Sequence, residues 1–291
     1  MLRLLRYLKP FYITLEGGKA AMDFAIFLKD TLPHVGLDWR RFRRKSIRRR
    51  VLSRMQELRI TSFRQYTAMI EESPDEQARF RVLLSVTISR FFRDRELFQT
   101  LQDRVLPECV GRCLPRGRCM VWSAGCASGE EPYSLAILWR TYFRMIPVEL
   151  RVCATDIDPH CLERARRAEY GPGSLKEVPP ELQRSCFEPL GQKYRVQHDI
   201  QEMVELRAHD LMTDRIPGRF RLVLCRNMAF TYFSPTLHER IAQKLHASLE
   251  AEGFLVIGQK ESLPAGSEDY FEQWDTSIYR RKGRGAITGV Q

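Results

Sequence analysis

The chain has no apolar run of the roughly 18 residues that a membrane-spanning helix needs. Its basic start also lacks the apolar core of a secretion signal, because Lys9–Pro10 and Glu16–Lys19 interrupt residues 1–27. The eight cysteines contain no CxxC pair and no paired framework, so we expect buried, free thiols in a cytoplasmic protein. Neither they nor the six histidines have the spacing of metal ligands, which predicts no metal site.

Acidic residues are absent between Trp39 and Glu57, where the chain concentrates its positive charge. Residues 1–60 hold 15 Lys/Arg against 5 Asp/Glu, which is +10 of the net charge of +11. The apolar residues that recur at helical spacing in this run are Ile47, Val51, Met55 and Leu58. They predict a helix with one buried stripe and basic outer faces. Such a run is ordinarily a solvated face, but this density of one sign favours an acidic partner, a protein helix or nucleic acid.

Helical patterns fill residues 22–108, and strands alternate with helices in residues 109–291. We therefore predict an all-α domain followed by an α/β domain with a parallel sheet and crossover helices. The helices predicted in the first domain include 62–70, 75–84 and 95–106, the last ending at Pro107. Prolines and polar residues break the pattern at 171–206, which predicts a small insertion. Residues 1–21 have no clear place in either domain.

The most informative segment follows a short apolar strand that ends at Trp122. Residues 123–131 read Ser-Ala-Gly-Cys-Ala-Ser-Gly-Glu-Glu and open a helix. Glycines let the backbone approach a ligand closely, and a helix N-terminus directs its free N–H groups to the same place. Because Glu130 and Glu131 would repel a phosphate, the turn predicts an uncharged or cationic nucleoside ligand, such as the sulfonium S-adenosylmethionine.

Two later strands also end in polar residues. One ends at Asp156, where an acid binds ribose hydroxyls in nucleotide-binding folds. Capping the following helix is the alternative role, although Asp158 is the better cap candidate. The other strand precedes Arg226 and Asn227. Since the carboxyl ends of strands in open α/β sheets line the ligand crevice, the three strand ends predict one site.

These motifs resemble those of the CheR-type protein-glutamate methyltransferases of bacterial chemotaxis. The stretches that carry the resemblance are Phe91–Asp94, Ser123–Ser134, Ala154–Asp158, Cys225–Asn227, Tyr232–Phe233 and Gly253–Gly258. They stand in family order and cover about residues 24–281. The resemblance implies a Rossmann-like α/β sheet that binds S-adenosylmethionine and releases S-adenosylhomocysteine. It further implies a small antiparallel insertion and an all-α N-terminal domain.

The resemblance also implies roles for single residues. Arg93 matches an arginine placed at donor and acceptor, where its fork would hold the glutamate carboxylate. A helix-end ion pair with Asp94 or Glu96 is its alternative role. Thr87 and Ser89 match an asparagine and a threonine of the family pattern, and each keeps a hydroxyl. The remaining implied cofactor residues are Gly125, Glu130, Asp156, Arg226 and Asn227, and for Arg226 bracing the end of the sheet is an equal alternative.

Tyr232 matches the active-site tyrosine of the family, but the spacing before it differs. The family has three residues between its asparagine and this tyrosine, whereas four, 228–231, stand here. The extra residue either bulges, so that Tyr232 still points into the site, or rotates it away. In the second case Phe230 would take part of its space.

The predicted reaction is the formation of methyl esters on glutamate side chains. A glutamate is ionised at neutral pH, with a pKa of about 4.3, so it needs no general base. The motifs offer none, since His160 and His198 lie off the strand ends. The implied substrate is an acidic, helical partner, a chemoreceptor or a related bacterial signalling protein. The predicted docking surface is Arg40, Arg44, Arg48 and Arg49.

Two alternatives stay open at this point. One is a methyltransferase for RNA or another substrate, which the charge favours. Trp39 and Phe42 are the only aromatics within the basic run, and RNA binders usually interleave more of them for stacking, so nucleic acid is the weaker partner. The other is a regulatory module that binds the cofactor without turnover, against which the retained Arg93, Glu130 and Asp156 argue.

Overall fold

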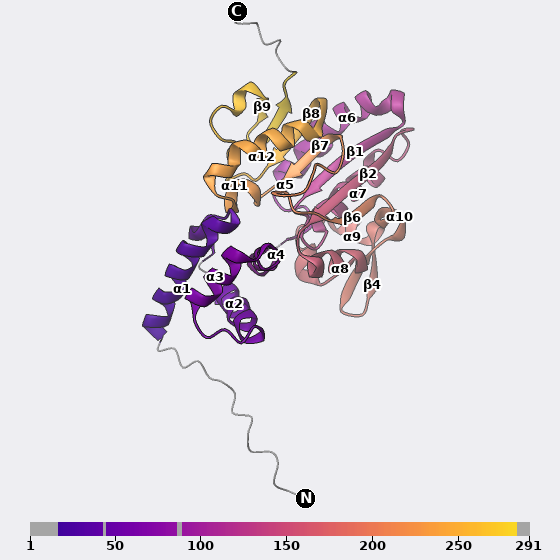
Figure 1. Cartoon of the computed structure of the whole chain (residues 1–291). Coiled ribbons are helices and arrows are strands. Elements are labelled where there is room, and N and C mark those ends of the chain that lie inside the picture. The colour runs from indigo at the N-terminus through magenta and orange to yellow at the C-terminus, as the bar shows by residue number, and fades with distance from the viewer. Residues whose placement is uncertain (1–16, 43–44, 86–88, 284–291) are drawn as a thin grey trace, which may run out of the picture. The chain divides into compact units, whose positions relative to one another are not determined.

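The computed structural model describes residues 17–42, 45–85 and 89–283, with side chains from Asp23 on. The chain divides into one unit that ends at Leu84 and another that begins at Ser85 (Figure 1). The α-helices described in the first unit are α1 (Gly17–Thr31), α2 (Lys45–Glu57), α3 (Phe63–Glu72) and α4 (Pro74–Leu84). Ser62 caps helix α3, since its Oγ accepts a hydrogen bond from Gln65 N. The predicted all-α character of this region is confirmed.

The basic helix α2 buries the apolar stripe that its periodicity predicts. Ile47, Val51 and Met55 are buried, while Leu58 follows the end of the helix and is half-buried. The Arg54 side chain is directed into the unit and does not belong to the basic surface. It donates two hydrogen bonds to the buried Glu76, 3.0 Å from Nε and 2.7 Å from Nη2, and Tyr66 Oη donates a third at 2.8 Å. Arg54 is therefore a structural residue.

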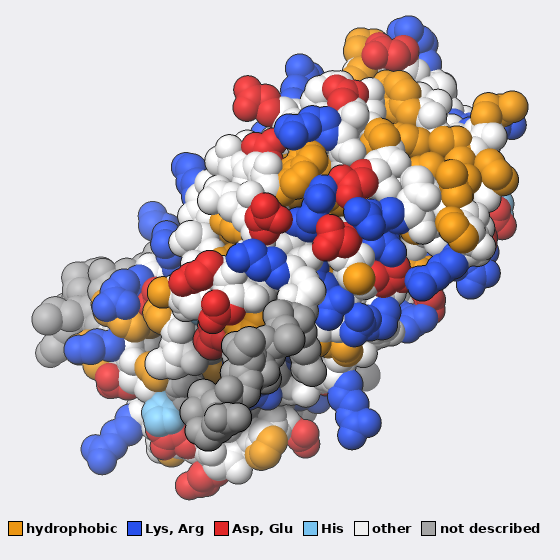
Figure 2. Space-filling model, turned by 90° about the horizontal axis from the view of Figure 1, so that it is seen from above, with side chains coloured by type: hydrophobic (Ala, Val, Ile, Leu, Met, Phe, Trp, Pro, Cys, Tyr) orange, Lys and Arg blue, Asp and Glu red, His pale blue; other side chains and the backbone are white. Residues whose placement is uncertain are grey.

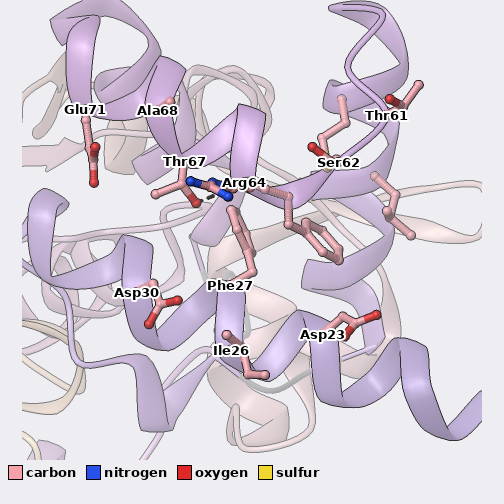
Figure 3. A pocket seen from close by; sticks show the side chains of 13 residues that line it. Asp23, Ile26, Phe27, Asp30, Thr61, Ser62, Arg64, Thr67, Ala68 and Glu71 are labelled. Atoms are coloured by element: carbon pink, nitrogen blue, oxygen red, sulfur yellow. Dashed lines mark hydrogen bonds between the residues drawn. The ribbon is translucent and has the colours of Figure 1, made fainter.

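A cavity of about 670 Å³ opens in the helical unit, between residues of α1 and α3 (Figure 3). Phe27, Met55 and Phe63 are among its apolar lining, and Asp23, Asp30 and Glu71 are its acids. It contains none of the predicted site residues.

The second unit is built on a seven-stranded sheet. Its strand order in the described chain is β6-β2-β1-β7-β8-β10-β9. The strands are β1 (Arg118–Ala124), β2 (Glu149–Asp156), β6 (Val204–Ala208), β7 (Phe220–Cys225), β8 (Leu249–Ile257), β9 (Phe271–Asp275) and β10 (Ile278–Arg281). All neighbouring pairs from β6 to β8 are parallel, and β10 is antiparallel to both its neighbours. The predicted α/β architecture is confirmed.

The crossover helices include α7 (Glu130–Tyr142), α8 (Pro159–Arg167) and α12 (Pro235–Ser248). After β1 the chain proceeds to β2 and β6 on one side, then returns to β7 and β8 on the other. The order of the sheet thus reverses between β1 and β7. This reversal is the position at which open α/β sheets bind ligands.

The division between the units lies earlier than the predicted boundary at residue 108. Residues 95–113 form α5 (Arg95–Thr100), a π-helical turn (Leu101–Val105) and α6 (Leu106–Cys113), and their buried side chains join the core of the sheet. The predicted end at Pro107 is wrong, because the π-turn before it accommodates the proline and the helix continues.

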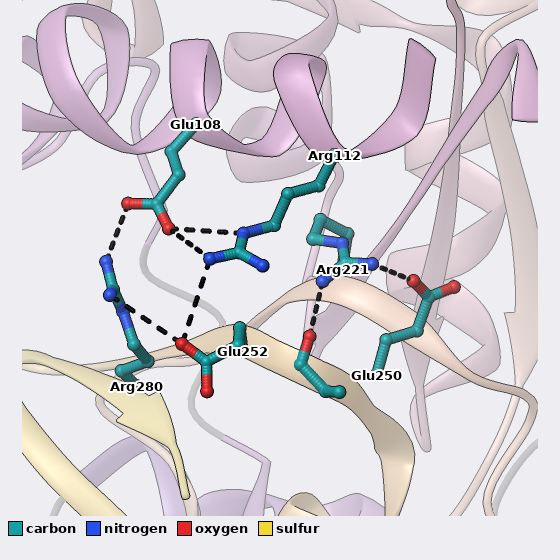
Figure 4. A network of polar contacts seen from close by, with 7 residues as sticks. Glu108, Arg112, Arg221, Glu250, Glu252 and Arg280 are labelled. Carbon is teal, nitrogen blue, oxygen red and sulfur yellow. Dashed lines mark hydrogen bonds and ion pairs between the residues drawn. The ribbon is translucent and has the colours of Figure 1, made fainter. Parts of the chain in front are cut away.

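Ion pairs hold α6 to the far strands of the sheet (Figure 4). Glu108 accepts a hydrogen bond from Arg280 at 2.6 Å, and Arg112 lies 3.8 Å from Glu252. Together with the buried side chains of 97–113, these contacts attach to the second unit a helical segment that the sequence groups with the first domain.

The insertion is a small antiparallel sheet, as expected. Its strands are β3 (Glu169–Tyr170), β4 (Phe187–Leu190) and β5 (Lys193–Val196), in the order β3-β5-β4. The predicted insertion at 171–206 ends too late, because residues 204–208 form β6 of the main sheet.

On the face drawn in Figure 2, basic and acidic side chains are interspersed. All eight cysteines are buried and free. Within residues 17–42, 45–85 and 89–283, no helix is both long and apolar enough to cross a membrane.

Candidate active site

The turn after β1 has the backbone shape that its glycines permit. Gly125 and Gly129 have φ angles of 77° and 92°, in the left-handed region that glycine adopts without steric cost. Gly125 N and Cys126 N donate to Thr155 O at 2.8 and 2.9 Å. The turn is thereby fixed to the end of β2, and α7 begins directly after it at Glu130.

Asp156 fastens the same turn with its side chain. Its Oδ2 accepts a hydrogen bond from Ala127 N at 2.8 Å, and its Oδ1 accepts one from Asp158 N at 2.9 Å. Burial raises the pKa of this carboxyl, although the two backbone N–H groups oppose the shift. Asp158 caps α8 as expected, since its Oδ1 accepts from His160 N, and it also binds Ser85. Asp156 is therefore not the helix cap.

Glu130 is the most deeply buried acid of the site, with 2% of its surface exposed. Ser174 Oγ donates to its Oε1 at 3.3 Å, and Ser89 lies within hydrogen-bonding reach of the carboxyl. Its Oε2 is buried and has no hydrogen-bond partner in the described part of the chain. Burial raises the pKa of this carboxyl as well. A buried carboxylate oxygen without a donor is suited to a cationic group of a ligand.

The Phe91–Asp94 loop has strained backbone at two residues. Phe92 and Asp94 have φ angles of 52° and 68°, which are uncommon for residues other than glycine. The loop is held by Ser134 Oγ, which accepts from Phe92 N at 3.0 Å, and by Ser174 O, which accepts from Phe91 N at 3.1 Å. The Arg93 side chain is exposed. Strained, tightly held loops of this kind concentrate at functional sites.

Arg226 braces the end of the sheet, which was one of its two predicted roles. Its guanidinium donates to Glu131 Oε2 at 3.0 Å, to Arg93 O at 3.0 Å and to Asp94 Oδ2. Only 3% of the side chain is exposed. Arg226 therefore joins the end of β7 to the start of α7 and to the loop that carries Arg93. Asp94 pairs with this arginine.

Glu261 is a residue that the sequence analysis missed. Its Oε2 accepts hydrogen bonds from Asn227 N at 2.7 Å and Gly258 N at 2.8 Å, and its Oε1 accepts from Thr231 Oγ1 at 2.7 Å. This single carboxylate joins the ends of β7 and β8. It lies outside every quoted motif, and only the fold brings it to the site. The Asn227 amide lies against Gly258.

The extra residue before Tyr232 is taken up in a single helical turn, α11 (Ala229–Tyr232). Tyr232 N donates to Met228 O at 2.9 Å, and the tyrosine side chain is half-buried. The Phe230 ring packs edge-on against His238 of α12, with ring centroids 5.4 Å apart. The contact of Tyr232 with a substrate remains a prediction. Thr87 lies outside the described residues.

The end of β6 adds a further residue that the sequence analysis passed over. His209 N donates to Asp156 O at 3.1 Å, so this histidine follows β6 directly beside the end of β2. Its ring Nε2 lies 2.9 Å from Arg215 O. The sequence patterns gave no signal for this residue, because residues 171–206 were assigned to the insertion and β6 was not predicted.

These features fit S-adenosylmethionine. Glu130 Oε2, which has no hydrogen-bond partner among the residues that the structure describes, suits its ammonium group, and Asp156, at the end of the second strand, is placed for ribose hydroxyls. The Gly125 turn allows close approach of the backbone. The structure brings Gly125, Glu130 and Asp156 together around one turn, and it brings Arg93, Arg226 and Asn227 together at the end of β7.

Comparison with known proteins supports this assignment. Residues 87–280 match the family model described as CheR methyltransferase, SAM binding domain, and residues 22–85 match CheR methyltransferase, all-alpha domain. A chemotaxis protein methyltransferase of Listeria innocua is 31% identical over 241 residues, which are 83% of this chain and 90% of that protein. A putative methyltransferase of Pseudomonas putida is 31% identical over 257 residues, 85% of this chain and 90% of that one. These matches confirm the predicted cofactor.

Proposed function

This chain belongs to the CheR family of S-adenosylmethionine-dependent methyltransferases, and we propose that it methylates glutamate side chains of an acidic, helical signalling protein in the cytoplasm. Relatives from several bacteria carry the name chemotaxis protein methyltransferase, which supports a role in chemotaxis or a related system. The proposal adds two claims to the family assignment: that the methyl acceptor is glutamate, and that the substrate is an acidic, helical protein.

The placement of Arg93 carries the proposal. Its backbone carbonyl is bonded to the buried Arg226, so the loop is anchored at the carboxyl end of β7 while the Arg93 guanidinium is exposed. A planar guanidinium is suited to hold a carboxylate through two parallel hydrogen bonds. An exposed arginine on a rigid loop at the cofactor crevice therefore supports a carboxylate acceptor.

The proposed chemistry asks little of the protein beyond positioning. When bound, the cofactor would supply a methyl group on a positively charged sulfur, and the sulfur would be the leaving group when the acceptor takes the methyl group. Glu130 and Asp156 bind its amino and ribose groups, and Arg93 orients the acceptor. The acceptor carboxylate is ionised at neutral pH, so none of these residues needs to remove a proton. Tyr232, as the match to the family tyrosine, is proposed to line the acceptor side.

The basic helical unit supports an acidic partner. Arg40 and Arg49 are exposed and Arg48 is half-buried, while Arg44 lies outside the described residues. Arg54 does not belong to this surface, because it pairs with Glu76 inside the unit. The proposed docking surface is accordingly Arg40, Arg44, Arg48 and Arg49 without Arg54.

Transfer of a labelled methyl group to a candidate receptor protein tests the reaction. The label should be lost in mild alkali, because a carboxyl ester hydrolyses there and an N-methyl group does not. Arg93→Ala should lower turnover strongly and keep most of the S-adenosylhomocysteine affinity. Label that survives alkali would instead indicate RNA or another acceptor, and cofactor binding without any transfer would indicate a regulatory module.

Charge reversal tests the docking surface separately. The combination of Arg40→Glu, Arg48→Glu and Arg49→Glu should raise the KM for the protein substrate and leave cofactor affinity unchanged. Rising salt should weaken substrate binding by the wild type, since exposed charges are screened within about 8 Å at physiological ionic strength. Arg64→Glu, an exposed arginine of α3, is the matched control. Wild-type KM in the triple variant at low salt would refute the docking surface.

A further inference from the structure

Met228 lies across the point at which the order of the sheet reverses. Two residues, Arg226 and Asn227, separate it from the end of β7 at Cys225, yet its side chain contacts the turn after β1. A Cβ added to Gly125 would lie 3.0 Å from Met228 Cε, 3.2 Å from Cγ and 3.5 Å from Cβ. The Met228 side chain, which follows β7, therefore packs directly against Gly125, which follows β1.

We propose that Met228 is a gate of the cofactor crevice, whose side chain covers the Gly125 turn and has to swing aside when S-adenosylmethionine binds. The cofactor and Met228 compete for the same backbone, since Gly125 begins the turn that leads to Glu130 and is bonded to the strand of Asp156. The inference rests on the cofactor of the family and holds for any methyl acceptor.

The backbone on both sides of Met228 is held, so the side chain is the part that moves. Asn227 N is bonded to Glu261, and Thr231 Oγ1 is bonded to the same carboxylate. Met228 O itself accepts from Tyr232 N. A methionine side chain is unbranched and flexible, with three rotatable bonds, and it repacks at low cost. The side chain is also half-buried, which leaves it a solvent-facing direction in which to turn.

Calorimetry and stopped-flow binding of S-adenosylhomocysteine, without any acceptor, test the gate. Met228→Ala should bind about three- to tenfold more tightly than the wild type, because the affinity is reduced by the fraction of molecules with the crevice closed. Its association rate should rise as well. Met228→Ile should bind more slowly than the wild type, because a β-branched side chain is stiff at χ1. Met69→Ala, which removes a half-buried methionine of α3, should change neither quantity.

Methyl NMR of the wild type, labelled at its methionines, provides a readout that does not depend on the variants folding. The Met228 methyl signal, assigned by its loss in Met228→Leu, should move on addition of S-adenosylhomocysteine, while that of Met69 stays in place. Unchanged or weaker affinity in Met228→Ala overturns the gate, and so does an unmoved Met228 signal at saturation. Neither result depends on whether glutamate is the acceptor, so failure of the gate is distinct from failure of the proposed reaction.

Discussion

Replacing Arg226 with glutamine tests the view that this residue braces the site and does not bind the cofactor. The substitution keeps most of the side-chain volume and removes the positive charge. It leaves the Glu131 and Asp94 carboxylates without their shared cation and the Arg93 carbonyl without its donor. The loop of Arg93 therefore loses its attachment to β7.

The magnitude follows from burial. Arg226 is 3% exposed, Glu131 14% and Asp94 25%. Removing one partner of a fully buried ion pair costs about 3–5 kcal/mol. Because water reaches Asp94 and relieves part of this penalty, we expect the variant to lose about 2–4 kcal/mol of unfolding free energy.

Urea unfolding, calorimetry and methyl transfer together check the prediction. Turnover should fall more than tenfold, since a loop displacement of about 1 Å is enough for a large loss. The affinity for S-adenosylhomocysteine should change less than about threefold, which is under 0.7 kcal/mol. The reason is that a bracing residue does not itself contact the cofactor. Arg221→Gln is the matched control: this arginine near the other end of β7 is also buried and pairs with Glu250 (Figure 4), so it should lower stability and spare turnover per folded molecule.

A large loss of cofactor affinity with unchanged stability would refute the bracing role. Arg226 would then be a ligand of the cofactor.

Three further predictions follow from the contacts of single carboxylates. Asp156→Asn should weaken S-adenosylhomocysteine binding at least tenfold in calorimetry. It should also destabilise the fold by about 1–3 kcal/mol, because the NH2 group of the new amide would face the backbone N–H of Ala127 or of Asp158 and two donors cannot bond to each other. Cofactor affinity should fall as the pH falls through the pKa of Glu130, which burial raises above its ordinary value near 4.5, because the protonated acid no longer attracts an ammonium group. Glu130→Gln should bind the cofactor weakly and show little of this pH dependence. Glu76→Gln should cost about 2–4 kcal/mol in urea unfolding, because it leaves Arg54 without its buried partner, and it should leave cofactor affinity unchanged.

The sequence by itself determined the class of fold and the cofactor. Short apolar runs and helical patterns depend on neighbouring residues, and they correctly predicted that strands alternate with helices in the second domain, although not the strand β6. The glycine turn, Glu130 and Asp156 also lie at the ends of predicted strands. Because parallel strands bring their carboxyl ends to one edge, their meeting in one site followed without a structure.

Only the tertiary structure decided which charged residues form buried contacts within the protein. In the sequence Arg54 is one more member of a basic run, but in the structure it forms an ion pair with the buried Glu76, 22 residues away in the chain. Arg226 reads as a ligand or a brace, and only the tertiary structure shows the three partners on other elements through which it braces the site. Glu261 stands in no motif, and Met228 reaches a turn more than a hundred residues earlier. Such contacts depend on which elements become neighbours, and local sequence patterns carry no record of it.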